Sequence, residues 1–122
     1  MSYIDGFVVP VDKNRLDEYR KTSRRFGKKC IELGALEYVE SVEDDVPPGK
    51  ITSFEMAVKR SASEVVFFSY IVYPNKRTRD RINKLMMSDP EWSNMDMAAS
   101  PMNGKHMIWG GFKPVVSLSS TT

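Results

Sequence analysis

His106 is the only histidine in the chain, and imidazole is the side chain whose ordinary pKa lies near neutrality. It is therefore the first candidate for a catalytic acid or base. The run from Lys105 to Pro114 that contains it also holds Trp109 and the pair Gly110–Gly111. A general base needs reach to a substrate and often an orienting partner, and the sequence assigns no such partner. A structural role for His106 is the favoured interpretation, and catalysis is the alternative.

Two tryptophans could line an apolar pocket, because an indole combines a large apolar body with one hydrogen-bond donor. We therefore take Trp92, His106 and Trp109 as the candidate ligand-binding residues, against the plainer interpretation that the tryptophans pack in a core or an interface. Cys30 falls on the apolar face of a predicted helix and is expected to be an inert thiol. Further hydroxyls that could position a substrate oxygen come from Tyr19, Tyr38, Tyr70 and Tyr73.

Composition restricts the class of protein. The chain has 122 residues, 41% hydrophobic and 28% charged, which fits one globular domain. A net charge of +2 is too small to indicate a nucleic-acid or membrane partner. A single cysteine cannot form an intrachain disulfide, and the sequence has no cluster of cysteines and histidines of the kind that binds structural zinc. We predict no metal and no cofactor, and the lack of a secretory leader or membrane span in the sequence favours a cytoplasmic protein.

Periodicity and turn residues predict six main elements. In chain order they begin with a strand over Tyr3–Val11 and a helix from about Asn14 to Leu33. Strands over Ala35–Glu43 and Glu64–Tyr73, a helix after Asn75 and a last strand within 105–114 follow. Thr52 or Ser53 is expected to begin a short helix, and Asp89-Pro90 another. The order strand, helix, strand, strand, helix, strand is that of a ferredoxin-like α+β domain with a four-stranded antiparallel sheet. The domain is expected to span residues 1–116, followed by a flexible tail over 117–122.

Local signals refine these elements. Asn14 is predicted to cap the first helix and Gly34 to follow its end, while Gly27 would allow close packing against the sheet. Alternation in the second strand places Leu36, Tyr38 and Val42 on one face and Val39 on the other. One face of the first helix is formed by Leu16, Tyr19, Ser23, Phe26, Cys30 and Leu33, and the apolar stripe of the second by Ile82, Leu85 and Met86.

The strand Glu64–Tyr73 is apolar on both faces, and the last strand is similar. An antiparallel sheet with one solvated face would alternate apolar and polar residues. The helices of the chain can cover only one face of the sheet. We therefore expect two copies to pack sheet to sheet through a two-fold axis. The alternative is that the insertion over Asp44–Glu64 folds across the open face.

Basic residues crowd both long helices, which suggests a basic outer face. Such a face could track phosphates, so an RNA-contacting protein is an alternative function. The sheet lacks the Gly-aromatic pattern of an RNA-recognition domain, and a solvated helix surface is the favoured explanation. A nucleic-acid partner is thus not expected.

Five blocks of sequence, in order, resemble the YbaA-like family of uncharacterised bacterial proteins. They are Asp5–Val8, Gly34–Glu40, Asp44–Lys50, Ile71–Tyr73 and Met107–Phe112. The resemblance runs from about Tyr3 to Val116. It implies membership of the dimeric α+β barrel superfamily, and with it a ferredoxin-like protomer and a sheet-to-sheet dimer. That superfamily includes cofactor-independent monooxygenases, muconolactone isomerases and haem-degrading enzymes, whose pockets usually lie between sheet and helices.

The leading hypothesis is a homodimer that binds a small, mostly apolar molecule. By superfamily analogy the protein would be a cofactor-independent monooxygenase or an isomerase, although fold alone does not establish function. The alternatives are the RNA-contacting protein and a dimer without a ligand.

Overall fold

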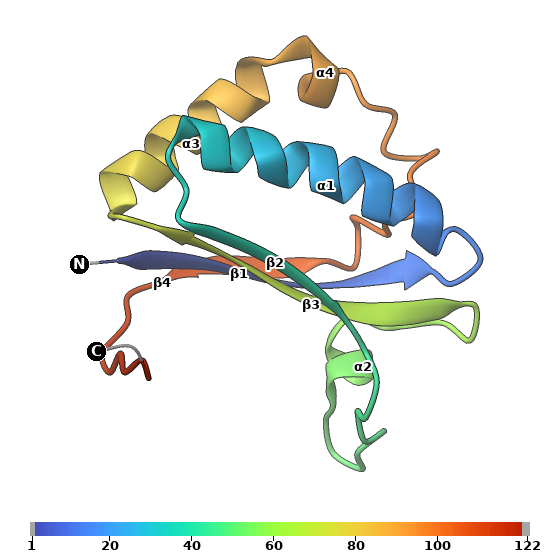
Figure 1. The fold of residues 1–122 in the computed structure, drawn as a ribbon. Coiled ribbons are helices and arrows are strands. Elements are labelled where there is room, and N and C mark those ends of the chain that lie inside the picture. The colour runs from blue at the N-terminus through green and yellow to red at the C-terminus, as the bar shows by residue number, and fades with distance from the viewer. Residues whose placement is uncertain (1, 121–122) are drawn as a thin grey trace.

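The computed structural model describes residues 2–120 and contains a four-stranded antiparallel sheet with its two long helices on one face (Figure 1). In chain order the elements are β1 (Tyr3–Asp12), α1 (Leu16–Leu33), β2 (Glu37–Val42), α2 (Phe54–Ala57), β3 (Glu64–Tyr73), α3 (Lys76–Ser88), α4 (Pro90–Ser93) and β4 (Ile108–Phe112). The strand order across the sheet is β2-β3-β1-β4. The predicted ferredoxin-like α+β fold is confirmed, and β3 has the predicted bounds. Residues 121 and 122 of the predicted tail lie outside the described residues.

Most helix ends follow their sequence signals. The side chain of Asn75 accepts a hydrogen bond from the Thr78 amide at the start of α3, and Ser53 caps α2 in the same way. Gly34 ends α1 with a φ of 125°, a backbone conformation that favours glycine. The prediction that Asn14 caps α1 is wrong. Its amide donates to the Asp12 carboxylate at 2.9 Å, which holds residue 14 in a turn, so that the helix begins at Leu16.

The core lies between the sheet and the helices α1 and α3. Its buried centre is formed by Cys30, Ala35, Ile71, Tyr73, Ile82 and Met86, with a neighbouring cluster of Val9, Val11 and Tyr19. The predicted apolar face of α1 is therefore confirmed. Leu85 departs from its prediction because its side chain is 45% exposed, so that the buried stripe of α3 consists of Ile82 and Met86. No helix within residues 2–120 has the length and apolar character required to cross a membrane.

Gly27 brings α1 close to β2, as predicted. A Cβ at this position would lie 2.5 Å from the Cδ1 atom of Tyr38, far inside van der Waals contact. Glycine therefore allows the Tyr38 ring to lie directly against the helix backbone.

Within residues 2–120, no long helix lies on the opposite face of the sheet (Figure 1). The exposed fractions of its side chains Phe68, Ile108 and Phe112 are 48%, 47% and 62%. The α2 segment lies on this side but reaches only one end of the face, where the Phe54 and Phe68 rings meet edge to face at 6.1 Å. The insertion therefore does not cover the open face, contrary to the alternative derived from the sequence.

The edge strand β4 differs from prediction on its other side as well. Trp109 pairs with Phe7 and shares its side of the sheet, which is the side that the helices cover. Its side chain is nevertheless 60% exposed. Trp109 therefore does not pack in the core within residues 2–120, which was one of the two structural interpretations of the tryptophans.

Candidate functional site

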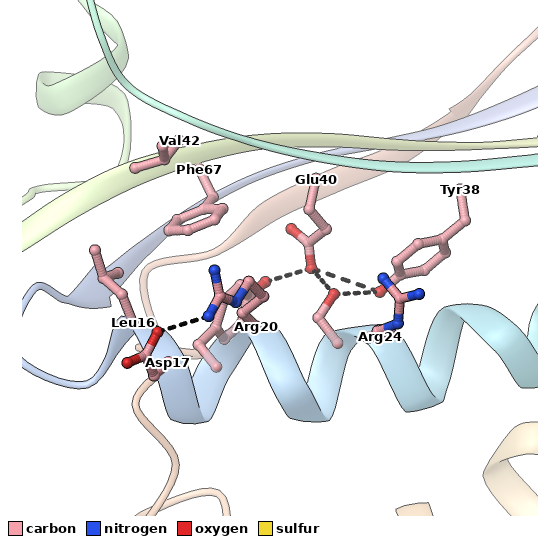
Figure 2. A pocket seen from close by; sticks show the side chains of 10 residues that line it. Leu16, Asp17, Arg20, Arg24, Tyr38, Glu40, Val42 and Phe67 are labelled. Carbon is pink, nitrogen blue, oxygen red and sulfur yellow. Dashed lines mark hydrogen bonds and ion pairs between the residues drawn. The ribbon is translucent and has the colours of Figure 1, made fainter.

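A carboxylate, Glu40, projects from the edge strand β2 towards α1 (Figure 2). Side chains alternate along a strand, so Glu40 shares its face with Tyr38 and Val42. The facing positions on α1 belong to Tyr19 and Ser23, which lie on the apolar side of that helix and are buried. The fold thus places an acidic side chain in the layer where apolar residues would ordinarily pack.

Four hydroxyl groups converge on the Glu40 carboxylate. Tyr19 donates to Oε2 at 2.7 Å, and the hydroxyl of Ser23 donates to the same oxygen. Ser69, from β3, donates to Oε1. Tyr38 makes the longest contact, 3.5 Å to Oε2, and its hydroxyl also lies 2.9 Å from the Ser23 hydroxyl. The donors come from α1, β2 and β3, so this network links three elements of the fold.

Both tyrosines are held as neutral phenols. Burial raises the pKa of Tyr19 far above its ordinary value, and the adjacent negative charge of Glu40 raises it further. The same two causes, in the same order, raise the pKa of Tyr38. At neutral pH both hydroxyls therefore keep their protons and serve as hydrogen-bond donors.

A cleft of about 440 Å³ opens between α1 and the sheet, with Glu40 among its lining residues (Figure 2). Its apolar walls are formed by Leu16, Val42, Phe67 and the tyrosine rings, and Phe67 packs edge-on against Tyr19 at 4.9 Å. Two arginines of α1, Arg20 and Arg24, line the same cleft. An adjoining hollow of about 570 Å³ shares Arg24 and Tyr38 with it.

The arginines differ in their partners. Arg20 forms an ion pair with Asp17 at 2.9 Å, one turn earlier on the helix. Arg24 has no ion-pair or hydrogen-bond partner within residues 2–120. The cleft therefore combines an apolar wall, an anionic group and an unpaired cationic group.

His106, the candidate catalytic residue, lies on a different part of the fold. The side-chain nitrogen of Asn103 donates to a carboxylate oxygen of Glu64 at 3.2 Å and lies 3.3 Å from Nδ1 of His106. Burial tends to raise the pKa of Glu64, but hydrogen bonds from Ser61 and Asn103 outweigh it and hold the pKa below its ordinary value. Asn103 is thus the orienting partner of His106 that the sequence did not assign. His106 does not line either of the two clefts.

The two tryptophans are separated as well. Trp92 packs edge-on against Phe26 at 5.1 Å, beneath the Arg25 guanidinium, and its indole nitrogen is buried without a hydrogen-bond partner within residues 2–120. Trp109 is exposed on β4. The structure does not bring Trp92, His106 and Trp109 around either of the two clefts.

A second charged cluster is sealed rather than open. Asp5 on β1 is 2% exposed and lies 3.4 Å from the guanidinium of Arg79, which also donates to the Tyr3 hydroxyl at 2.9 Å. Burial outweighs the attraction of Arg79 and raises the pKa of Asp5. A Cβ on Gly111 would fall 2.2 Å from the Tyr3 hydroxyl, so the close approach expected at Gly110–Gly111 occurs at Gly111.

Comparison with known proteins places the chain in a family. A model of the family described as "Protein of unknown function (DUF1428)" matches residues 2–104. The chain belongs to this family. The protein YbaA of Escherichia coli K12, described as uncharacterised, is 45% identical over 116 residues, covering 95% of this chain and 98% of its own. YbaA of Shigella flexneri matches equally, and the predicted YbaA-like membership is confirmed.

Two solved structures share the fold. Each is described as a dimeric ferredoxin-like protein from an uncultured marine organism. The first has a TM-score of 0.64 and 7% identity, and the match covers 96% of this chain and 98% of that one. The second has a TM-score of 0.60 and 9% identity, with 98% and 99% covered. At these identities the likeness concerns the fold alone.

Proposed function

We propose that the protein is a homodimer in which each protomer binds a small, mostly apolar molecule in the cleft beside Glu40. The observation that carries the proposal is the convergence of four hydroxyl groups on a carboxylate that lines a cleft with an apolar wall. Ligand sites are typically apolar cavities with a few placed polar groups, and about 440 Å³ falls within their usual size.

A purely structural network is the competing explanation for Glu40. Buried polar networks link elements in many proteins, but a carboxylate requires several donors to offset its desolvation. Here four residues supply those donors, although apolar side chains at the same positions could join α1 to the sheet more simply. The network also borders open space rather than lying sealed in the core. These features support a ligand site.

The dimer is supported by the uncovered face of the sheet. Phe68, Ile108 and Phe112 form an exposed apolar surface of the kind that marks an interface. The two solved structures that share the fold are described as dimeric. Packing two such faces together would remove these side chains from water and leave the Glu40 cleft on the helical side.

The chemistry that fits the cleft is proton transfer. A positioned carboxylate can accept a proton from a bound substrate and return it, and neighbouring hydroxyls can stabilise an oxygen on which charge develops. This is compatible with an isomerase or a cofactor-independent monooxygenase, the activities expected by superfamily analogy. We extend the proposal to a cytoplasmic location on the basis of cysteine usage.

The assembly can be tested by sedimentation of the wild type and of Phe112→Glu, in which a charge enters the open face. Ser93→Glu, with the same charge change on the exposed end of α4, is the control. We expect the wild type and the control to sediment as dimers and Phe112→Glu as a folded monomer. A wild type that is monomeric at micromolar concentration would contradict the dimer.

Ligand binding can be tested with a library of small apolar and aromatic compounds, using thermal stabilisation followed by NMR. We expect at least one compound to raise the melting temperature and to perturb amide signals of α1 and β2. Glu40→Gln, which keeps the size of the side chain but removes its charge, should weaken this binding while the variant stays folded. A library without any binder, or binders that leave α1 and β2 unaffected, would refute the cleft.

The alternative of an RNA-contacting protein depends on the basic residues of the helices. Five of these are already paired with acids: Arg20 with Asp17, Arg25 with Glu91, Lys29 with Glu32, Lys76 with Asp80 and Arg79 with Asp5. This reduces the charge available to phosphates and favours the small-molecule proposal. Ligand contacts by Trp92, His106 and Trp109 stay a prediction, and salt-sensitive RNA retention would support the alternative.

A further inference from the structure

We infer that the ligand of the Glu40 cleft is an uncharged phenol, whose hydroxyl donates to Oε1 of Glu40 and whose ring lies toward Phe67 and Val42 (Figure 2). The inference rests on the proposed function and adds the ligand's charge, its donor group and its position in the cleft. Three features carry it: an unfilled acceptor position on Glu40, the place of the apolar wall, and the balance of charge in the lining.

The two carboxylate oxygens of Glu40 are not used equally. Three hydroxyl groups, from α1 and β2, contact Oε2. Within residues 2–120, Ser69 is the one donor to Oε1. A carboxylate oxygen accepts about two hydrogen bonds, so Oε1 keeps a position for a further donor. Figure 2, in which Ser69 is not drawn, shows the oxygen without dashed lines on the side of Glu40 that faces Phe67.

The apolar wall lies on that same side of Glu40. In the register of β2 and β3, Glu40 pairs with Ser69. Val42 pairs with Phe67 two positions further along β2, whereas Tyr38 lies two positions in the opposite direction. A strand rises about 3.3 Å per residue, which places the apolar pair about 7 Å from Glu40 along the strand. The ring of a phenol bound to Oε1 can therefore lie against this pair.

The charges that line the cleft balance one another. The lining includes two acids, Asp17 and Glu40, and two arginines, Arg20 and Arg24. An anion in the cleft would be repelled by Glu40, and a cation would be repelled by the arginines. The lining therefore favours an uncharged ligand that offers a hydrogen-bond donor to Glu40.

A phenol suits this acceptor because the protein already directs a phenol hydroxyl to it. Tyr19 donates to Oε2 of Glu40 at 2.7 Å, and its ring packs edge to face against Phe67 at 4.9 Å. A ligand ring beside Phe67 would make a similar aromatic contact. Its hydroxyl would bond to an ionised acceptor, and such bonds are stronger than those between neutral groups.

Titration calorimetry with matched probes tests the donor and the charge. The probes are 4-ethylphenol, its methyl ether, which lacks the donor, the anion 4-ethylbenzoate, and 4-ethylbenzylamine, a cation at neutral pH. We expect the wild type to bind 4-ethylphenol about tenfold or more tighter than each of the others. Glu40→Gln should reduce the preference over the ether to less than about threefold. Glu37→Gln, which removes an exposed charge of β2 outside the lining of this cleft, should keep it.

Two variants test the position of the ring. Val42→Glu adds a charge on the side of Glu40 where the ring is expected, and Leu36→Glu makes the same change on the same face of the chain beyond Tyr38. These two apolar side chains are 48% and 58% exposed, so both variants should fold. We expect Val42→Glu to weaken binding of 4-ethylphenol about tenfold, because its charge would be desolvated by the ring, and Leu36→Glu to change it by less than about twofold.

The colour of 4-nitrophenol reports the charge of a bound phenol, because its ionised form is yellow. The negative charge of Glu40 should raise the pKa of the bound phenol and hold it in the neutral form. At a pH where half of the free compound is ionised, binding to the wild type should therefore reduce the yellow absorbance. This loss of colour should be smaller in Glu40→Gln.

Equal binding of the phenol and its ether, tighter binding of the anion or the cation, or a bound 4-nitrophenol that stays yellow would overturn the inference while leaving the cleft as a ligand site. An equal loss in Val42→Glu and Leu36→Glu would also overturn it. Failure of all the probes would do so as well, and the compound library would then decide separately on the proposed function. If Glu40→Gln does not fold, the preferences of the wild type and the comparison of Val42→Glu with Leu36→Glu decide.

Discussion

Replacing Gly27 with alanine sets two effects of opposite sign against each other. Alanine is the better helix former by about 1 kcal/mol, which would stabilise α1. The added Cβ, however, would lie 2.5, 2.7 and 2.8 Å from three atoms of the Tyr38 ring. Overpacking of this kind costs about 1–3 kcal/mol when neighbours must move.

The Tyr38 ring is not free to move. Its hydroxyl lies 2.9 Å from Ser23 and contacts Glu40 at 3.5 Å, so moving the ring away from α1 strains this network at a cost of about 1 kcal/mol. Subtracting the gain in helix propensity leaves a net loss of stability of about 1–3 kcal/mol for Gly27→Ala. The same shift would widen the cleft and weaken any ligand held between α1 and β2.

Urea unfolding at one fixed protein concentration measures this difference, because the stability of the proposed dimer would depend on concentration. Gly104→Ala is the matched control, since a Cβ there would meet only the flexible end of Met97 at 3.3 Å. Its unfolding free energy should change by less than about 0.5 kcal/mol. A Gly27→Ala variant as stable as the wild type, or more stable, would show that helix propensity prevails and that the contact with Tyr38 is not tight.

Three further variants or reactions probe the sealed parts of the core. Gly111→Ala should lose about 1–3 kcal/mol in urea unfolding because its Cβ would fall 2.2 Å from the Tyr3 hydroxyl, whereas Gly110→Ala, with its nearest contact at 3.6 Å, should be nearly neutral; equal effects would contradict the close approach. Burial raises the pKa of Asp5 above the ordinary 3.8, so the folded protein binds this proton more tightly than the unfolded chain, and the contribution of Asp5 to stability declines as pH rises. The unfolding free energy of the wild type minus that of Asp5→Asn should therefore fall as the pH rises above about 4, and a rise would refute the sign. Burial also raises the pKa of the Cys30 thiol to about 11, so alkylation by iodoacetamide at mildly alkaline pH should be slow in the native protein and fast in urea, as mass spectrometry would show.

Much of the fold follows from local patterns. The alternation over Glu64–Tyr73 defines β3 to the residue, and the side chains of Ser53, Asn75 and Asp89 mark the starts of three helices. These signals succeed because each depends only on residues within one turn or one strand. The prediction that Asn14 caps α1 is wrong because the backbone amide of Asn14 donates to the Asp12 carboxylate and holds residue 14 in a turn. Capping preferences alone do not reveal this interaction.

The candidate site left a weaker trace in the sequence. Ser23, Glu40 and Ser69 are polar residues at positions whose periodicity faces the core, and such departures from the pattern often mark function. Glu40 lies midway between Tyr38 and Val42, which alternation already placed on one face. His106 and Trp109 are the stronger candidates in the sequence because of the chemistry of their side chains. Their separation from the cleft depends on tertiary placement at the end and edge of the sheet, which local sequence does not encode.

Asp5 and Glu40, two carboxylates of the sheet, differ in what they can do, because Asp5 is buried and Glu40 is only partly buried. The Asp5 side chain is 2% exposed and lies against Arg79. Glycine at position 111 leaves the space that the Tyr3 hydroxyl and the Arg79 guanidinium occupy beside it. A buried ion pair of this kind can fix the position of α3 relative to β1, but no substrate can reach it. Glu40 is held by neutral hydroxyls rather than by a cation, so its charge is not cancelled by a partner. Because it borders a cleft, that charge is available to a bound molecule, and this is why the ligand proposal rests on Glu40.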